Sequence, residues 1–302
     1  MIVTEMYHKP VLLKQSIEGL NIRDGGIYVD ATYGGGGHTS AILEELKEGK
    51  LFAFDQDLDA FENIKPNPKL DVIHSNFRFM REQLNAKGIT QVDGILADLG
   101  ISSHQIDTPG RGFSIRFDAP LDMRMNSGQM RTAADIVNTY PTNRLQKMFS
   151  VYGEIPNSGK LAATIEKARL MGHIKTTGDL VDAIKSCTPL HGQNKYLAKV
   201  FQSLRIEVNE ELDALKDLLR QSEQLLKKGG RLVIISYHSL EDRLVKDFTR
   251  TGNFEGIPDK NVFGHDIRPL EPMTKKPIVP TEEEITDNSR ARSAKLRIAE
   301  KI

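Results

Sequence analysis

The sequence has little cysteine, no tryptophan, no excess of either charge and no long apolar run. Cys187 is the single cysteine, which excludes an intramolecular disulfide and a zinc site built from thiolates. No apolar run is longer than that of Leu232 to Ile235, far short of the roughly 20 residues that span a bilayer. The opening residues carry Glu5 where a secretory signal needs basic residues before an apolar stretch, so we expect a protein of the reducing cytoplasm.

The charge and composition are typical of a globular protein. Lysine plus arginine and aspartate plus glutamate each number 41, so the formal net charge is zero. This balance disfavours a protein that coats nucleic acid without sequence preference, but it permits a local basic patch. The 302 residues, 39% hydrophobic and 27% charged, are enough for a sizeable core and for about two domains.

Short apolar runs separated by helix-length segments predict a parallel sheet in the first third of the chain. The runs are Ile27 to Asp30, Leu51 to Asp55, Leu70 to His74 and Val92 to Leu99. Alternation of this kind is typical of parallel strands joined by crossover helices. It predicts a doubly wound, Rossmann-like α/β fold, in which ligands bind outside the carboxyl ends of the strands.

The alternation then stops and resumes near the end of the chain. Residues 111–125, rich in Gly, Pro and Arg, predict a long functional loop, and only helical patterns follow as far as Gly229. Among them, Thr176-Thr-Gly-Asp179 predicts a helix cap. A leucine stripe from Leu212 to Leu226 predicts a helix that Lys227-Lys-Gly-Gly230 stops.

Arg231 to Ser236 is again a buried-strand pattern, and Ala294 to Ile302 predicts a last, antiparallel edge strand. We therefore expect a discontinuous α/β domain over residues 1–110 and 230–302. Residues 111–229 would form the loop and an inserted all-helical domain that recognises the substrate.

A run of four glycines follows the first predicted strand, in Asp30-Ala-Thr-Tyr-Gly-Gly-Gly-Gly-His38, and a helix is expected to start near Thr39. Glycines permit positive φ and let a ligand lie against bare backbone, while the helix N–H groups bind a carboxylate or phosphate. The run does not match the G-x-G-x-x-G pattern that binds nicotinamide cofactors. The third glycine of that pattern would fall at Thr39 if the pattern starts at Gly34, and at Ser40 if it starts at Gly35. A flexible loop without a ligand is the alternative.

Asp55 ends the second predicted strand, 19 residues after Gly36. Its two carboxylate oxygens match the vicinal hydroxyls of a ribose, so we expect it to hold an adenosine cofactor. A turn-forming aspartate is the alternative interpretation. Asp57, close by, is expected to point away and to be solvated.

Asp98 leaves the fourth predicted strand in Asp98-Leu-Gly-Ile-Ser-Ser-His-Gln105, at the topological switch point of the sheet. The exocyclic amine of a base is a poor nucleophile, because its lone pair is delocalised into the ring. A carboxylate that accepts the amine N–H bonds favours a more tetrahedral nitrogen and orients it for in-line attack. We therefore expect Asp98 to be catalytic, with a helix cap or turn residue as the alternative.

Taken together, these segments resemble the bacterial 16S rRNA (cytidine-N4)-methyltransferases, the RsmH/MraW type, over nearly the whole chain. Several motifs occur in order and at compatible spacing. They are His8-Lys-Pro-Val-Leu-Leu13, Asp30-Ala-Thr-x-Gly-Gly-Gly-Gly-His38, Asp98-Leu-Gly-Ile-Ser-Ser-x-Gln105, Arg111-Gly-Phe-Ser114, Pro120-Leu-Asp-Met-Arg-Met125, Phe201-Gln-Ser-Leu-Arg-Ile-Glu-Val-Asn209, Ser236-Tyr-His-Ser-Leu-Glu-Asp-Arg243 and Ser289-Arg-Ala-Arg-Ser-Ala-Lys-Leu-Arg297.

The resemblance implies S-adenosyl-L-methionine (SAM) as cofactor and a cytidine of 16S rRNA as substrate, within the small ribosomal subunit. It also raises a homodimer as an oligomeric state. The cofactor site that it implies consists of Gly36, Gly37, His38, Asp55, Phe77, Asp98 and Gln105. Phe77 would pack on adenine or, in the alternative, belong to the core.

The sequence also departs from the family pattern at three places. Gln15 stands where Glu is usual, and Tyr237 where Phe is common. After Glu154 the run continues Ile-Pro-Asn instead of with charged residues. None of these departures touches the matched cofactor positions.

Two clusters of basic residues are candidates for RNA contact, because arginine forks suit phosphates and base edges. One cluster lies in or beside the predicted loop and the other near the C-terminal end. Phe113 and Phe117 would stack on a splayed base or belong to the core. His238 would line the substrate pocket or be a structural histidine. The clusters are Arg111, Arg116, Arg124 and Arg131, and Arg290, Arg292, Lys295 and Arg297.

Other chemistries find less support. His238, Ser239 and Glu241 are too close in sequence for a hydrolase triad, and Ser239-Leu-Glu-Asp242 is better interpreted as a helix cap. The histidines show no metal-binding spacing, so no metal site is expected. The sequence predicts a SAM-dependent methyltransferase of cytidine N4 in 16S rRNA. The alternatives are a methyltransferase acting on another base or on protein, and a non-catalytic RNA-binding or ribosome-assembly factor.

Overall fold

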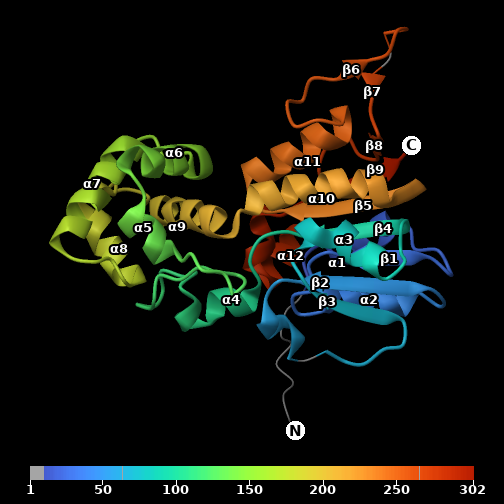
Figure 1. The fold of residues 1–302 in the computed structure, drawn as a ribbon, viewed down its shortest axis with the longest axis horizontal. Helices are drawn as coiled ribbons and strands as arrows, with labels where there is room; N and C mark the ends of the chain where they lie inside the picture. Colours follow the sequence, from blue (N-terminus) through green and yellow to red (C-terminus); the bar gives the residue numbers. More distant parts are fainter. Residues whose placement is uncertain (1–9, 63, 265) are drawn as a thin grey trace. The chain divides into compact units, whose positions relative to one another are not determined.

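The computed structural model describes residues 10–62, 64–264 and 266–302, and His8 and Lys9 of the first motif lie outside them. Its main sheet has the order β3-β2-β1-β4-β5-β9-β8 (Figure 1). The first five strands are parallel, β9 runs antiparallel to β5, and β8 runs antiparallel to β9. This order, with β1 beside β4, confirms the doubly wound fold class. The strands are β1 (Ile27–Asp30), β2 (Lys50–Asp55), β3 (Leu70–His74), β4 (Val92–Asp98), β5 (Leu226–Ser236), β8 (Leu270–Pro272) and β9 (Lys295–Lys301).

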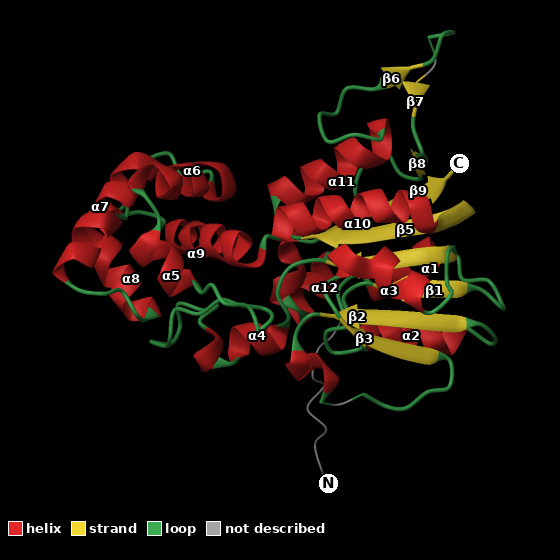
Figure 2. Cartoon of the chain, viewed as in Figure 1, coloured by secondary structure: helices red, strands yellow, loops and turns green. Residues whose placement is uncertain are grey.

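Apolar side chains of the strands alternate between two cores, one on each face of the sheet. On β4, Leu96 packs in one core, whereas Ile95 and Ala97 pack in the other. Helices α1 and α2 supply apolar side chains to the first core, and α3, α10 and α11 to the second. Strands buried on both faces explain why these segments are almost continuously apolar. The helices of this unit are α1 (Leu13–Leu20), α2 (Gly37–Glu45), α3 (Met80–Ala86), α10 (Glu211–Leu225), α11 (Ser239–Thr251) and α12 (Glu282–Asp287), and a small hairpin pairs β6 (Asp259–Lys260) with β7 (Asp266–Ile267) (Figure 2).

Residues 101–211 form a second compact unit, whose helices surround a core of their own. As predicted, the segment after η3 (Pro109–Arg111) has no helix or strand up to Thr132. It is nevertheless anchored, because Leu121 and Met123 are buried in that core. The side chain of Asn209 accepts the Met125 N–H at 2.7 Å and donates to the Met123 carbonyl at 2.8 Å. The helices are α4 (Ser103–Asp107), α5 (Ala133–Thr139), α6 (Thr142–Gly153), α7 (Ser158–Met171), α8 (Thr177–Ile184) and α9 (Gln193–Asn209).

The unit boundaries differ from those expected. The α/β unit runs up to Gly100 and resumes at Leu212, where we expected limits at 110 and 230. The leucine stripe of α10 is the reason, because its buried side chains Leu215, Leu218 and Leu219 pack in the core of the sheet. A stripe of leucines predicts an amphipathic helix, but it does not say which core that helix covers.

Two predicted details near β5 are wrong. Helix α10 ends at Leu225, before the basic residues and glycines, because Leu226 already pairs with Val92 and begins β5. Lys227–Gly230 instead lie in the strand, where the register between β4 and β5 shifts. Strand β9 is antiparallel as predicted but is not at the edge, since β8 pairs with its other side. No helix in the described part of the chain is both long and apolar enough to cross a membrane.

Candidate functional site

The glycine run forms a tight turn between β1 and α2. Gly34 and Gly36 have φ of +51° and +73°, in the left-handed region that favours glycine. The turn is closed by the Gly36 N–H, which donates to the Tyr33 carbonyl at 2.7 Å. A Cβ at Gly36 would lie 2.8 Å from the Tyr33 hydroxyl, whereas one at Gly34 would meet nothing closer than 3.9 Å. Gly36 is therefore buried against Tyr33, whereas Gly35 is exposed, and α2 begins at Gly37.

Asp55, at the end of β2, holds this turn. Its carboxylate accepts the Gly34 N–H at 2.8 Å through one oxygen and the Asp57 N–H at 2.9 Å through the other. Burial raises the pKa of Asp55 to about 6. The expectation that Asp57 is solvated is wrong, since it is only 6% exposed and accepts the Asp59 N–H as a helix cap.

Asp30, Thr32 and Thr39 tie two strand ends and a helix together. The Asp30 carboxylate accepts the Thr39 hydroxyl at 2.7 Å and the Thr32 N–H at 3.1 Å. The Thr32 hydroxyl oxygen accepts the Asp98 N–H at 2.7 Å, which joins the ends of β1 and β4. Burial raises the pKa of Asp30 to about 6. Neither Asp30 nor Thr39 was expected from the sequence to be a site residue, although the glycine motif begins at Asp30 and is followed by Thr39.

Asp98 lies at the centre of the site and is held from two sides. The Tyr237 hydroxyl donates to Asp98 Oδ1 at 2.8 Å, and Nδ1 of His38 lies 3.9 Å from Asp98 Oδ2. Nε2 of His38 lies 3.1 Å from the Val11 carbonyl oxygen, which fixes the ring. Burial lowers the pKa of His38. The Asp98 side chain remains 17% exposed, so the carboxylate is accessible at the carboxyl end of β4.

The structure thus brings five predicted residues to the carboxyl ends of β1, β2 and β4. Gly36, Gly37 and His38 start α2, while Asp55 and Asp98 end their strands. Local folding accounts for this convergence, because the carboxyl ends of parallel strands meet at one edge of the sheet.

The other predicted cofactor residues have structural contacts of their own. Phe77 begins the 3₁₀ turn η2 (Phe77–Phe79) and packs, partly buried, against the core that contains α3. Gln105 belongs to the helical unit, where it forms a capping box of α4 with Ser102. Their roles toward a cofactor stay predictions.

The two loop arginines predicted to bind substrate hold the loop together. Arg111 donates to the carbonyls of Arg124 and Met125 at 3.0 and 2.9 Å. Arg124 makes two parallel hydrogen bonds to the Asp122 carboxylate, at 2.8 and 2.7 Å. Phe113 is buried in the helical core, whereas Phe117 is 44% exposed. Contact of these arginines with RNA stays a prediction.

The remaining predicted substrate residues follow β5 or precede β9. His238 caps α11, since its Nδ1 accepts the Glu241 N–H at 3.3 Å and Glu241 bonds back to the backbone. The cap is therefore His238 and not Ser239, which is the first residue of the helix. Arg290 and Arg292 lie in η5 (Ser289–Ser293), where Arg292 is exposed and Arg290 is partly exposed.

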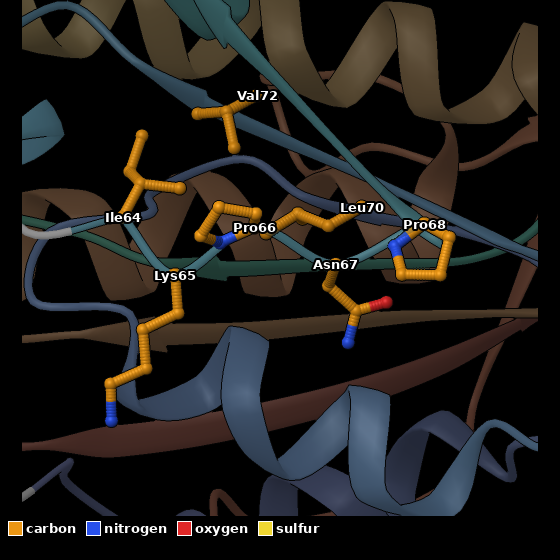
Figure 3. Close-up of a pocket in the computed structure, with 7 residues that line it drawn as sticks. All are labelled: Ile64, Lys65, Pro66, Asn67, Pro68, Leu70 and Val72. Carbon is orange, nitrogen blue, oxygen red and sulfur yellow. The ribbon is translucent and has the colours of Figure 1, made fainter.

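A surface hollow of about 410 Å³ lies beside the start of β3, and Figure 3 shows the residues that line it. Because it lies at the amino end of an edge strand, it is separate from the carboxyl ends where the candidate site is built. The lining residues are Ile64, Lys65, Pro66, Asn67, Pro68, Leu70 and Val72.

By its strand order and glycine turn, the chain is a doubly wound α/β protein of the kind that binds a ligand at the strand carboxyl ends. Residues 5–302 match the model of the MraW methylase family, and the chain belongs to that family. It is therefore a methyltransferase, and the family resemblance of the sequence is confirmed.

Known relatives match the chain along its length. The chain is 55% identical over 298 residues to the ribosomal RNA small subunit methyltransferase H of Cytophaga hutchinsonii, covering 98% of this chain and 100% of that protein. It is 53% identical over 298 residues to the protein of the same name from Parabacteroides distasonis, covering 98% of each. A solved rRNA methylase of Streptococcus thermophilus is 14% identical to the chain. The match covers 98% of this chain and 99% of that one, with a TM-score of 0.38.

Proposed function

We propose that the protein transfers a methyl group from SAM to the N4 amine of a cytidine in small-subunit rRNA. The observation that carries this proposal is a glycine turn beside two acidic strand ends, in a member of the MraW methylase family. The relatives named ribosomal RNA small subunit methyltransferase H support the choice of rRNA. The substrate would be the RNA within the small ribosomal subunit.

The residues present fit SAM. The glycine turn leads into the N-terminus of a nine-residue helix, whose first N–H groups have no partner within the helix and suit a carboxylate. The Asp55 carboxylate already accepts the backbone N–H groups of Gly34, Asp57 and Gln56, and its remaining lone pair would accept a ribose hydroxyl. When bound, SAM would supply an electrophilic methyl group on a sulfonium.

Asp98 would act on the amine. Its carboxylate accepts an N–H bond of the cytidine N4, which orients the nitrogen and opposes delocalisation of its lone pair. N4 would gain the methyl group as the methyl–sulfur bond of SAM breaks, which leaves SAH, and N4 would release one proton to water. The Asp98 carboxylate would stabilise the positive charge that develops on the nitrogen. Arg292, which is exposed in η5, would contact RNA phosphates.

The proposal is tested with methyl-labelled SAM and small ribosomal subunits from cells that lack the enzyme. We expect label in the small-subunit rRNA. Label in a ribosomal protein would favour a methyltransferase of another class. If calorimetry shows no binding of SAM and no label is transferred, the protein is instead a non-catalytic RNA-binding or assembly factor.

Cofactor affinity should depend on pH through Asp55. The ionised carboxylate would accept a ribose hydroxyl, and burial raises its pKa to about 6. Affinity for S-adenosylhomocysteine (SAH) should therefore fall about tenfold as the pH is lowered from about 7.5 to about 5. Calorimetry at several pH values measures this change.

The control for this prediction is Asp55→Asn, which removes the titration and keeps one acceptor oxygen. The variant should bind SAH more weakly, with an affinity that is nearly constant over the same range. If it shows the pH dependence of the parent protein, another group, such as Asp30, is responsible.

A further inference from the structure

Tyr237 contacts Asp98, although the two residues are distant in sequence. It directly follows β5, and its hydroxyl donates to Asp98 Oδ1 at 2.8 Å. The two residues are 139 positions apart, and pairing of Asp98 with Ile235 brings the strand ends together. The Tyr237 N–H is held in turn by the Glu241 carboxylate at 2.9 Å. Tyr237 is thus held at two points, its backbone N–H and its phenol hydroxyl.

The direction of this hydrogen bond is set by charge. Burial and the nearby carboxylate of Asp98 raise the pKa of Tyr237 far above its ordinary value, so the phenol stays protonated. A carboxylate accepts and a protonated phenol donates, so Oδ1 of Asp98 is held as an acceptor.

We propose that Tyr237 is a positioning residue, which holds the Asp98 carboxylate in the rotamer that receives the substrate amine. This inference rests on the proposed function and deepens it. Without the hydroxyl, the carboxylate keeps its place on β4 but loses the bond that restricts its rotation. A reactive group displaced by a fraction of an ångström loses much of the benefit of orientation, while binding of the substrate is little affected.

Other ionisable groups also face Asp98. His38 approaches from the start of α2, at 3.9 Å, and the charge of Asp30 at the end of β1 acts on the same region. Both remain in a Tyr237 variant, so a change in the titration of Asp98 reports the lost hydroxyl. Because a hydrogen bond to the ionised form lowers the pKa of an acid, removing the donor raises that pKa.

The test compares Tyr237→Phe with Tyr28→Phe. Each substitution deletes one hydroxyl, but the Tyr28 hydroxyl accepts the Arg23 N–H and takes no part in the site. For Tyr237→Phe we expect kcat to fall about tenfold with KM for SAM and for the subunit within about twofold. The acidic limb of the kcat profile should move to higher pH, since Asp98 must be ionised to accept the amine. Tyr28→Phe should leave all of these unchanged.

A second readout needs no substrate. In the ligand-free protein, the NMR signal of the Asp98 carboxyl carbon is followed as a function of pH, and it is assigned by its absence in Asp98→Asn. This signal should titrate at higher pH in Tyr237→Phe than in the parent protein. Unchanged kcat and unchanged titration in Tyr237→Phe, with an active parent protein, would overturn the inference. If the parent protein itself transfers no methyl group to rRNA, the proposed function fails, and the inference about positioning fails with it.

Discussion

Asp98→Ala should reduce the rate of methyl transfer by about a thousandfold, which is the range of a lost acid–base group. The variant removes the only side-chain carboxylate that our account assigns to the amine. The backbone of Asp98 stays bonded to Thr32, and the loss of the Tyr237 contact costs only about 1–3 kcal/mol of the free energy of unfolding. Single-turnover kinetics with labelled SAM measure the effect on the rate, and thermal unfolding checks the fold.

Asp93→Ala is the matched control for this variant. Asp93 lies on the same strand, where it accepts the Ile27 N–H at 2.9 Å and pairs with Lys227 at 2.7 Å. Its loss should lower the free energy of unfolding by a similar amount but leave the rate of methyl transfer unchanged. A rate for Asp98→Ala within about fivefold of that of the parent protein would remove Asp98 from the chemistry.

Gly36→Ala should weaken SAH binding by about ten- to a hundredfold. At φ of +73° an alanine costs about 1–2 kcal/mol, and its Cβ would lie 2.8 Å from the hydroxyl of the buried Tyr33. The turn must therefore shift by a few tenths of an ångström, which displaces the N–H groups at the start of α2. Calorimetry with SAH measures the loss of affinity.

Gly25→Ala is the control for backbone strain, because it introduces the same strain as Gly36→Ala without displacing the glycine turn. Gly25 has almost the same backbone conformation, with φ of +74°, but a Cβ there would meet nothing within 4 Å. Both variants should lose the free energy of unfolding that the strained backbone costs, about 1–2 kcal/mol, while only Gly36→Ala should lose affinity for SAH. Equal affinities in the two variants would mean that the glycine turn does not bind the cofactor.

Local sequence patterns were sufficient to predict many of the strands and turns of the α/β unit. Apolar runs predicted β1 and β3 with the bounds that the structure shows, and the Thr176–Asp179 capping box is present. Strand ends and glycine turns follow from short sequence segments, so Gly36, Asp55 and Asp98 were found in the same way. These features depend on residues that are close together in the chain.

Features that depend on tertiary pairing were missed. The Tyr237–Asp98 contact requires the register of β4 against β5, which no local pattern specifies. Sequence comparison marked Tyr237 only as a departure from the family, without a role. The partners of Arg111 and Arg124 are likewise backbone carbonyls and a carboxylate that only the folded loop brings together. An arginine cluster in the sequence therefore predicts charge, but not whether that charge already has a partner.

Nucleoside analysis of the small-subunit rRNA after reaction tests the account most directly. The rRNA is isolated, digested to nucleosides and separated by chromatography with mass detection. The account predicts that the transferred methyl group is recovered as N4-methylcytidine, and that the product is missing when Asp98→Ala replaces the parent protein. Recovery of the methyl group on another base, or on the ring or the ribose of cytidine, would contradict it.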